Sequence, residues 1–302
     1  MRVSTSRSLA CLLLLAGAVG VMAPAAAAGD LPDVLAAGEL RHLAIRYAGF
    51  CSGPEAGLDV EVVRLFARRL GVTYVFVESD WSRIIPDLLG REVVRDGAGA
   101  ACGAVVPVRG DLIATGMTMI PWRGQVVAFS RPMFPTQIWL VAPADSPLSP
   151  IAPSADLGHD IARTSSRLGG LSVLAKTNTC LDPSLYDLSG RGARVVEFDD
   201  ALRFMAPAVL AGEAEATILD VPDALVALSH FPGRIKVVGP ISPPQAMAAA
   251  FRPDAPQLRA AFDAFLAEIY ADGTYGALVA RYYPAVFSHF PAFFADQGVV
   301  LP

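Results

Sequence analysis

Apolar and polar positions follow two periods along the chain, and together they predict alternating strands and helices. Residues 40–45, four of which are apolar, predict a first strand. The stretch after them places Val60, Val63 and Phe66 at helical spacing on one face. A second apolar run, at 72–77, is again typical of a strand. This strand–helix–strand order predicts two parallel strands joined by a right-handed crossover.

The same alternation continues along the rest of the chain and predicts an α/β protein, with mostly parallel sheets flanked by helices. The 302 residues suffice for one large domain or two modest ones. Asp80, Ser154 and Asp199 are the expected N-caps of three helices. Further strands are expected at 136–142, 171–175, 194–198, 216–220, 235–238 and 246–251, and helices at 81–89, 155–168, 200–212, 258–269 and 274–283.

One segment, DLIATGMTMIPWRGQVVAFSRP at 111–132, gathers the residues most suited to ligand binding. Its apolar start predicts a buried strand that ends at Thr115 and Gly116, small residues that allow a ligand to approach the backbone. Thr118 and Arg123 follow, and the proline two residues before Arg123 suits the first turn of a short helix. A hydroxyl, free backbone N–H groups and a guanidinium therefore meet at the carboxyl end of a strand, where α/β sheets bind ligands.

Arginine presents a planar fork that holds a carboxylate through two parallel hydrogen bonds, so Arg123 predicts a carboxylate clamp. The alternative is an arginine that pairs with a neighbouring acid on a solvated helix. The segment resembles the family 3 periplasmic solute-binding proteins, the amino-acid receptors of ABC importers, in which an Asp, a small-residue bend, a Thr, an Arg and an FS-x-P strand follow in order. Here these are Asp111, Thr115-Gly116, Thr118, Arg123 and residues 129–132. The resemblance implies that Arg123 holds the α-carboxylate of the ligand and that Thr115 and Gly116 bond its polar groups.

Three more residues of the first lobe gain a role from this resemblance. GLDVEVVRLFARRLG, after the first predicted strand, resembles the first helix of the family, which implies that Tyr47 covers the ligand. Trp81 stands where the family packs an apolar side chain on the ligand. Arg46 lies where the family often contacts the ligand side chain, and its charge would favour an acidic one. The alternatives are a half-buried Tyr47, a Trp81 in the core, and an Arg46 neutralised by a nearby glutamate such as Glu55.

The second lobe is expected to contribute two further elements. Lys176-Thr177-Asn178-Thr179 stands at the place of the family's Gly-Thr-Thr, where a helix start binds the ligand carboxylate. Thr177 and Asn178 keep the hydroxyl and amide character, whereas Lys176 replaces the glycine. Asp220 ends a predicted strand, and from the residues alone it is the N-cap of the next helix. The resemblance implies that it takes the α-ammonium of the ligand, so that Arg123 and Asp220 together would detect a zwitterion. Both residues are expected on the surface of an open cleft.

Two regions extend beyond the family's usual pattern. The polar stretch 91–109 is predicted to form a hairpin. Because it joins the beginning of the next strand, whereas ligands bind at strand ends, we expect it to lie away from the cleft and to make no ligand contact. ADGTYGALVARYYP, at 271–284, resembles the C-terminal signature of the family. The aromatic tail at 285–302 resembles the receptor-like module of membrane-bound lytic transglycosylase F.

The N-terminus has the features of a targeting segment. Arg2 and Arg7 precede an apolar stretch at 9–21, and three alanines at 26–28 offer a cleavage site. We therefore expect a cleaved signal peptide at 1–28 and a periplasmic mature protein. With the family's architecture, the rest of the chain is expected to form two lobes of a type II periplasmic binding protein, linked by a hinge. Lobe 1 would comprise 29–135 plus 246–302, and lobe 2 would comprise 136–245.

Composition narrows the function further. The formal charge of −5 and the lack of a basic stripe argue against nucleic-acid binding. The four histidines and the cysteines do not occur at metal-ligand spacing, so no metal or other cofactor is expected. An exported protein can oxidise one pair among Cys51, Cys102 and Cys180. A Cys51–Cys180 bond would tie the two lobes together, and we expect it to be absent.

These observations predict a monomeric binding protein rather than an enzyme. Its expected role is to capture a small polar solute, an amino acid or a related carboxylate, and to deliver it to the membrane permease of an ABC transporter. One alternative is a periplasmic enzyme similar to cyclohexadienyl dehydratase, which has the same fold and needs an acid–base group in the cleft. The other is a ligand-sensing or regulatory module.

Overall fold

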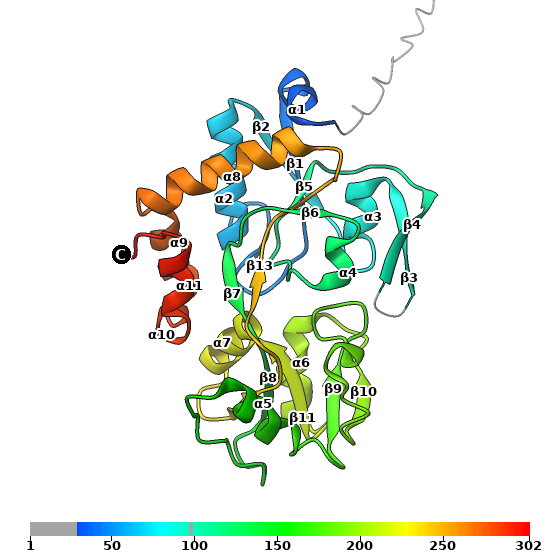
Figure 1. The fold of residues 1–302 in the computed structure, drawn as a ribbon, viewed down its shortest axis with the longest axis vertical. Coiled ribbons are helices and arrows are strands. Elements are labelled where there is room, and N and C mark those ends of the chain that lie inside the picture. Colours follow the sequence, from blue (N-terminus) through cyan, green and yellow to red (C-terminus); the bar gives the residue numbers. More distant parts are fainter. Residues whose placement is uncertain (1–28, 97–98) are drawn as a thin grey trace, which may run out of the picture.

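The computed structural model describes residues 29–96 and 99–302, and the predicted signal peptide at 1–28 lies outside the described residues. Two bodies, each a sheet with helices packed on it, lie one above the other in Figure 1. We call the body that holds the N-terminal strands the first body and the other the second body. The predicted α/β class is confirmed.

The first body contains a five-stranded mixed sheet in the order β2-β1-β5-β14-β6. β1 (Glu39–Ala44) pairs in parallel with β2 (Thr73–Glu78) and with β5 (Leu112–Ile113). β14 (Ala250–Phe251) runs antiparallel to β5 and to β6 (Ala128–Phe129). The parallel pairing expected from the first strand–helix–strand unit is confirmed. β2 lies at the edge of the sheet, so its apolar residues are only half-buried.

Helices cover both faces of this sheet. Leu112 belongs to the apolar cluster that contains α2 (Leu58–Leu70) and α8 (Pro256–Ala271). Its neighbour Ile113 points the other way and belongs to the cluster that contains α3 (Ile84–Leu89). Successive side chains of a strand alternate between the two faces of a sheet, so the two residues of β5 contribute to the apolar clusters on both faces.

The second body repeats this arrangement. Its sheet has the order β10-β9-β11-β8-β12, in which β9 is parallel to β10 and β11, and β8 is antiparallel to β11 and β12. The helices α5, α6 and α7 pack on it. The bounds are β8 (Ile138–Pro143), β9 (Ser172–Ala175), β10 (Arg194–Glu197), β11 (Ala216–Asp220), β12 (Ile235–Pro240), α5 (Leu157–Ser165), α6 (Met205–Leu210) and α7 (Val221–His230).

Three predicted helices begin later than expected. Asp80 accepts hydrogen bonds from the N–H groups of Ser82 and Arg83 in a turn, and α3 starts only after this turn. Asp156 rather than Ser154 caps α5. The predicted helix at 200–212 is divided into a 3₁₀ turn, η2 (Leu202–Phe204), and the short α6. A proline in the first turn of α6 has no N–H to donate, which suits a helix start at that point.

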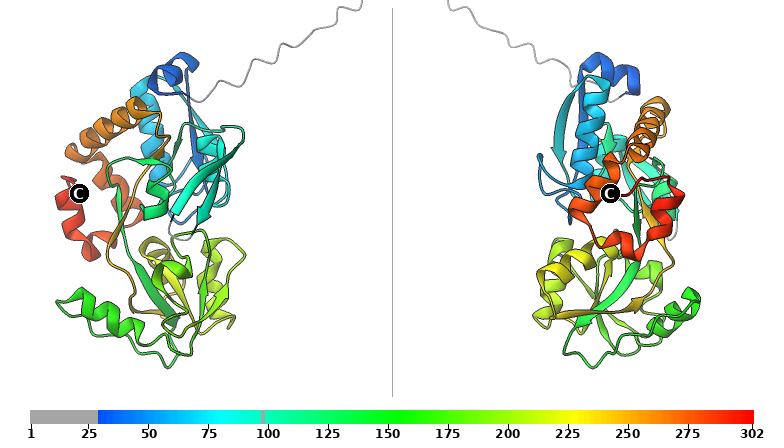
Figure 2. Two further views of the ribbon diagram at one scale, coloured as in Figure 1. Left: turned by 45° about the vertical axis from the view of Figure 1, so that its right-hand side comes forward. Right: turned by 90° about the vertical axis from the view of Figure 1, so that its left-hand side faces the viewer.

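The chain crosses between the bodies twice. β7 (Phe134–Thr136) leads from the first body to the second and pairs antiparallel with β13 (Gln245–Met247), which leads back (Figures 1 and 2). The lobe boundaries given above remain a prediction. The C-terminal helices lie on the left of the molecule in Figure 1, beginning beside the first body. They are α9 (Thr274–Tyr282), α10 (Val286–His289) and α11 (Pro291–Asp296).

The stretch 91–109 contains the predicted hairpin, formed by β3 (Arg91–Asp96) and β4 (Gly99–Val105). The expectation that it lies away from the cleft is wrong. Arg95 Nη1 donates to Asp182 Oδ2 at 2.9 Å and to Asn178 Oδ1 at 3.1 Å, and both acceptors belong to the second body. This ribbon is a separate two-stranded sheet that packs beside α3 and α4, and the carboxyl end of β3 points toward the second body (Figure 1).

Two short helices complete the described part of the chain. They are α1 (Leu31–Ala37) and η1 (Pro183–Tyr186). No helix within residues 29–96 and 99–302 is both long and apolar enough to cross a membrane.

Candidate functional site

Arg123 lies at the end of β5's connection to β6, in the one-turn helix α4 (Pro121–Gly124). Its side chain is only 1% exposed. Nη1 donates to the carbonyl oxygen of Thr118 at 3.1 Å, and Nε has no hydrogen-bond partner. The guanidinium lies 5.4 Å from the ring centres of Trp81 and Trp122. Burial lowers the pKa of Arg123. Among the described residues, Arg123 forms no ion pair with a carboxylate.

Asp220 ends β11 in the second body and is the N-cap of α7. It is fully buried, and its Oδ1 accepts from the N–H of Asp223 at 3.2 Å. Oδ2 accepts a short hydrogen bond from the Tyr47 hydroxyl and a weaker one from Cys180 Sγ at 3.4 Å. Burial raises the pKa of the Asp220 carboxyl. The expected N-cap is therefore present, and the Tyr47 hydroxyl and the Cys180 thiol are two further donors to this carboxylate.

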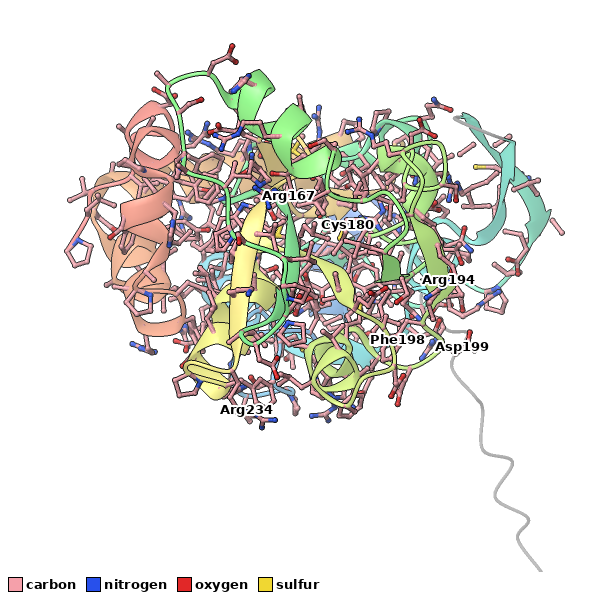
Figure 3. All side chains as sticks on the ribbon, turned by 90° about the horizontal axis from the view of Figure 1, so that it is seen from below. Arg167, Cys180, Arg194, Phe198, Asp199 and Arg234 are labelled. Carbon is pink, nitrogen blue, oxygen red and sulfur yellow. The ribbon has the colours of Figure 1, made fainter. Side chains whose placement is uncertain are left out.

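The hydrogen bond between Tyr47 and Asp220 joins the two bodies. The sequence analysis expected Arg123 and Asp220 on the surface of an open cleft, and this expectation is wrong. Both side chains are buried because the bodies contact each other at this point. Seen from the end of the second body (Figure 3), Cys180 lies well inside the outline of the molecule and Arg234 lies at its edge.

The bend after β5 is occupied largely by contacts within the protein. Thr115 Oγ1 donates to the carbonyl of Ile45 at 2.9 Å. The N–H of Gly116 donates to Asp59 Oδ2 at 2.7 Å. Gly116 has a φ of 63°, and a Cβ there would lie 2.4 Å from the ring of Phe50. The glycine is thus required by a left-handed turn and by a close aromatic ring, not by open space for a ligand.

Thr118 differs from these two residues. It is fully buried, and its Oγ1 has no hydrogen-bond partner within the described residues. Its carbonyl oxygen is the acceptor for Arg123. A buried hydroxyl without a partner has an energetic cost, and the side chain of Cys180 lies beside it.

The aromatic residues that the sequence singled out lie together. Tyr47 is buried and meets Trp81 edge-on, with ring centres 5.6 Å apart. Trp81 in turn covers the guanidinium of Arg123. Arg46 is nearby but is exposed and ion-paired, with its Nε 2.9 Å from Glu78 Oε1. The glutamate that neutralises it is Glu78, not Glu55.

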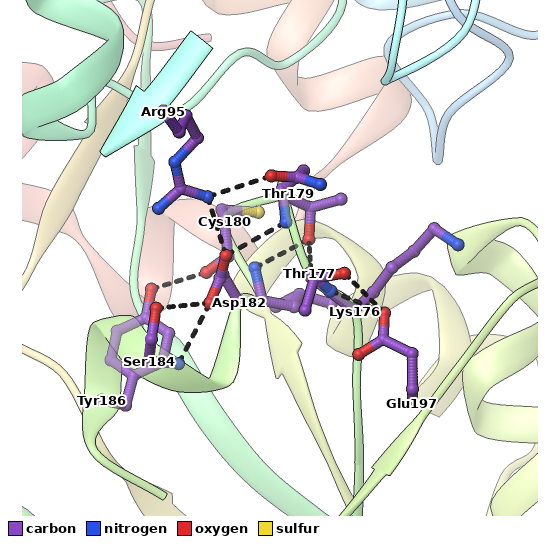
Figure 4. Close-up of polar contacts among 11 residues, drawn as sticks. Arg95, Lys176, Thr177, Thr179, Cys180, Asp182, Ser184, Tyr186 and Glu197 are labelled. Atoms are coloured by element: carbon purple, nitrogen blue, oxygen red, sulfur yellow. Dashed lines mark hydrogen bonds and ion pairs between the residues drawn. The ribbon is translucent and has the colours of Figure 1, made fainter. Parts of the chain in front are cut away.

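Thr177 and Asn178 are exposed and engage other groups of the protein (Figure 4). The N–H and the hydroxyl of Thr177 donate to Glu197 Oε1. The N–H of Asn178 donates to Asp182 Oδ2, and its amide oxygen accepts from Arg95. These two residues are therefore not directed at Arg123 in this conformation. The chain forms a turn here, in which Asn178 has a φ of 62°.

A cavity of about 340 Å³ lies between the two bodies. Tyr47 and Trp81 form part of its wall, Arg46 and Lys176 also border it, and Leu202 lies on the side of the second body. Trp81 borders the cavity and also covers Arg123, so this one side chain contacts both. Asp80, Asp199 and Asp200 line the rim.

Sequence reasoning missed four residues of this site. Cys180 follows the 176–179 motif directly, and Trp122 precedes Arg123, so adjacency to a motif was a usable signal. Asp223 lies in the first turn of the helix that Asp220 caps. Arg95 carried no local signal, because its partners are more than eighty residues away along the chain.

Comparison with known proteins identifies the family and the fold. A family model described as bacterial extracellular solute-binding proteins, family 3, matches residues 92–285, more than half of the chain. Among solved structures, a mutant of ArgBP from T. maritima is similar, with a TM-score of 0.66 and 24% identity over 84% of this chain and 99% of that one. The ancestral amino acid-binding protein AncCDT-1, a precursor of cyclohexadienyl dehydratase, is also similar. Its TM-score is 0.64 and its identity 21%, over 84% of this chain and 98% of that one. The structure of Tv2483 bound to L-arginine has a TM-score of 0.65 and 17% identity, over 84% of this chain and 94% of that one. At these identities the structures establish the fold.

Proposed function

Since the chain belongs to the bacterial extracellular solute-binding proteins of family 3, we propose that it captures a small zwitterion, an amino acid or a related compound, between Arg123 and Asp220. The proposal includes export to the periplasm, supported by the signal-like N-terminus, and delivery of the solute to the permease of an ABC transporter. It also includes the lobe boundaries at 135–136 and 245–246, with the two crossings as the hinge.

The burial of Arg123 is the observation that carries this proposal. A guanidinium removed from water needs a negative partner and hydrogen-bond acceptors. Arg123 has one carbonyl acceptor, and its Nε has none. A ligand carboxylate would supply both the charge and the acceptors, and the Thr118 hydroxyl would be a further donor to it.

Asp220 supports the other half of the proposal. Its Oδ2 accepts from the Tyr47 hydroxyl and the Cys180 thiol, and both groups are neutral, because burial raises the pKa of each of them. An ammonium group forms stronger, charge-assisted hydrogen bonds with a carboxylate than neutral donors do. We therefore propose that the ligand ammonium displaces one or both of these donors, while Tyr47 and Trp81 cover the ligand.

Binding would favour closure of the two bodies. Arg123 belongs to the first body and Asp220 to the second, so a zwitterion contacts both only when they are together. A ligand shifts a conformational equilibrium by its differential affinity for the two states, and here only the closed state offers both contacts.

Mass spectrometry of the natively purified protein tests the proposal. We expect a small molecule with both a carboxylate and an amine to copurify, or one of the twenty standard amino acids to bind in calorimetry. A copurified ligand without a carboxylate would contradict the proposal, and so would failure of every amino acid in calorimetry of protein freed from bound ligand.

A further inference from the structure

A second cavity between the bodies, of about 450 Å³, lies outside the cluster of Arg123 and Asp220. Residues 46–52 of the first body border it on one side, and η2, α6 and α7 of the second body on the other. Neither Arg123 nor Trp81 borders it. Its volume is in the range of small-molecule sites, and, like most such sites, it is lined mainly by apolar side chains. Leu219, Val226 and Phe231 are examples.

Asp223 is the polar group of this cavity that most needs a partner. It lines the cavity and is 6% exposed, and within the described residues its buried Oδ2 has no hydrogen-bond partner, with the Tyr47 hydroxyl beside it. Its contact with Asp220 uses only the backbone N–H. Burial and then the neighbouring Asp220 carboxylate raise the pKa of Asp223 well above its usual range. Two buried carboxyl groups thus lie side by side, and a cationic group in the cavity would stabilise the ionised form of the second one.

The opposite charge borders the same cavity. Arg46, Arg203 and His230 line it, and all three are exposed, so they lie toward solvent rather than in the interior. Arg46 is paired with Glu78. The guanidinium of Arg203 lies 4.5 Å from the ring centre of Phe204 and forms no ion pair in the part of the chain that the structure describes. The cavity therefore has an acid in its interior, apolar walls, and an unpaired cation at its opening.

We propose that this cavity is a second binding site, which takes an elongated amphipathic molecule with a protonated amine at one end and an anionic group at the other. The ammonium binds Asp223 Oδ2, the apolar chain lies along Leu219 and Val226, and the anion faces Arg203. The site does not depend on Arg123, so it stands or fails separately from the proposed amino-acid site.

Proton release accompanies binding at this site. Asp223 is held in its neutral form by burial and by Asp220, with the Tyr47 hydroxyl beside both. When the ammonium arrives, the carboxyl loses its proton to solvent and the ammonium keeps all of its own. Binding therefore releases one proton at a pH below the pKa of Asp223, and Arg46, Arg203 and His230 face the opening rather than this carboxyl.

Calorimetric titration with 6-aminohexanoate as the ligand tests the proposal, with hexylamine and hexanoate as molecules that keep only one end. We expect 6-aminohexanoate to bind the wild-type protein at least tenfold more tightly than either comparison molecule. Titrations in two buffers of different ionisation enthalpy should show proton release. Asp223→Asn should weaken binding at least tenfold and abolish the proton release.

Two further variants separate the possible failures. Ala227→Leu fills the cavity without changing a charge, because Ala227 is buried and lines it; it should also abolish binding of 6-aminohexanoate. Arg123→Met should leave this binding unchanged. Equal binding to wild type, Asp223→Asn and Ala227→Leu would overturn the proposal, and so would absence of binding by the wild-type protein at millimolar concentration. Loss of binding in Arg123→Met would assign the molecule to the first site and overturn the second.

Melting curves of each variant identify those that fail to fold, and a folded Ala227→Leu suffices if Asp223→Asn does not fold.

Discussion

Arg123 and Asp220 are buried to the same extent, yet their surroundings satisfy them to different degrees. Asp220 accepts from a backbone N–H, a hydroxyl and a thiol, whereas Arg123 donates to a single carbonyl oxygen and leaves Nε without a partner. The carboxylate of Asp220 therefore has several hydrogen-bond donors from the protein, whereas the guanidinium of Arg123 has few acceptors. The difference indicates that a ligand carboxylate adds contacts at Arg123, whereas a ligand ammonium only exchanges contacts at Asp220.

This comparison has an energetic consequence. Hydrogen bonds exchanged for other hydrogen bonds contribute little net free energy, whereas an unpaired buried charge that gains a partner contributes more. We therefore expect the carboxylate of the ligand to dominate the binding free energy. The predictions that follow run from the largest expected effect to the smallest.

Replacing Arg123 by methionine should have the largest effect. The variant loses the carboxylate partner, and binding of the amino acid should weaken by on the order of 2–5 kcal/mol. This corresponds to tens- to thousands-fold in the dissociation constant. Without ligand, the variant should melt at or above the wild-type temperature, because it removes a desolvated charge that has no acidic partner. Calorimetric titration and differential scanning calorimetry measure the two effects.

Arg259→Met is a matched control for this prediction. The Nε of Arg259 is also buried without a partner, and its Nη1 contacts the carbonyl of Phe129 at 3.4 Å, within the first body. It should leave binding unchanged. If Arg123→Met binds as tightly as wild type, or if both variants lose binding equally, the clamp is wrong.

Asp220→Asn should cost less than Arg123→Met. Asparagine keeps the N-cap of α7 and can still accept from Tyr47, so only the charge is removed. We expect binding to weaken about tenfold, or about 1.4 kcal/mol, with little change in melting temperature. The same titration checks this, and a loss equal to or larger than that of Arg123→Met would reverse the comparison.

Removal of the hairpin contact should have a smaller effect. Arg95 bridges to Asp182 across the junction, and its ion pair is partly buried, with side-chain exposures of 21% and 6%. Such a pair contributes roughly 1 kcal/mol or less, because solvent screens it in part. Arg95→Ala should weaken ligand binding a few-fold, mainly through faster dissociation in stopped-flow measurements, and small-angle scattering should show a larger radius of gyration without ligand.

Arg91→Ala serves as its control. Arg91 is exposed, and its side chain donates to the carbonyl of Gly103 within the same hairpin. An unchanged dissociation rate in Arg95→Ala, or an equal change in Arg91→Ala, would show that the contact with the second body does not hold the closed form.

A change of pH should affect one end of the site and not the other. Burial raises the pKa of Asp220 above that of an ordinary aspartate, so this carboxyl is ionised only above its raised pKa. Attraction for an ammonium is complete above that pKa and is lost as the pH falls through it. The guanidinium of Arg123 remains charged in that range. Affinity for a zwitterion should therefore decrease modestly in acid, whereas affinity for its deaminated analogue should not; parallel losses for both molecules would contradict this.

The sequence predicted the arginine side of the site better than the aspartate side. Pro121 and Arg123 lie in one short helix after one strand, so local pattern sufficed to place them. Tyr47 and Trp81 were predicted to cover a ligand, and they do lie together next to Arg123. The parallel pair β1–β2 and the α/β class followed from periodicity alone.

What the sequence did not predict depends on contacts between distant segments. The closure of the bodies through Tyr47 and Asp220 spans 173 positions of the chain, and no local pattern encodes it. The hairpin at 91–109 was assigned correctly as a ribbon, yet its reach to Asn178 and Asp182 depends on how it packs beside α3 and α4. The helix at 200–212 was predicted as continuous, because a 3₁₀ turn and an α-turn have similar apolar spacing.

Changing the ligand rather than the protein tests the central claim most directly, because no variant has to fold. The amino acid that binds best in a panel of twenty is compared by calorimetry with its methyl ester, which lacks the carboxylate charge, and with its deaminated analogue. The comparison of Arg123 and Asp220 predicts that both changes weaken binding and that the ester loses more. An ester that binds as tightly as the parent amino acid would contradict the account.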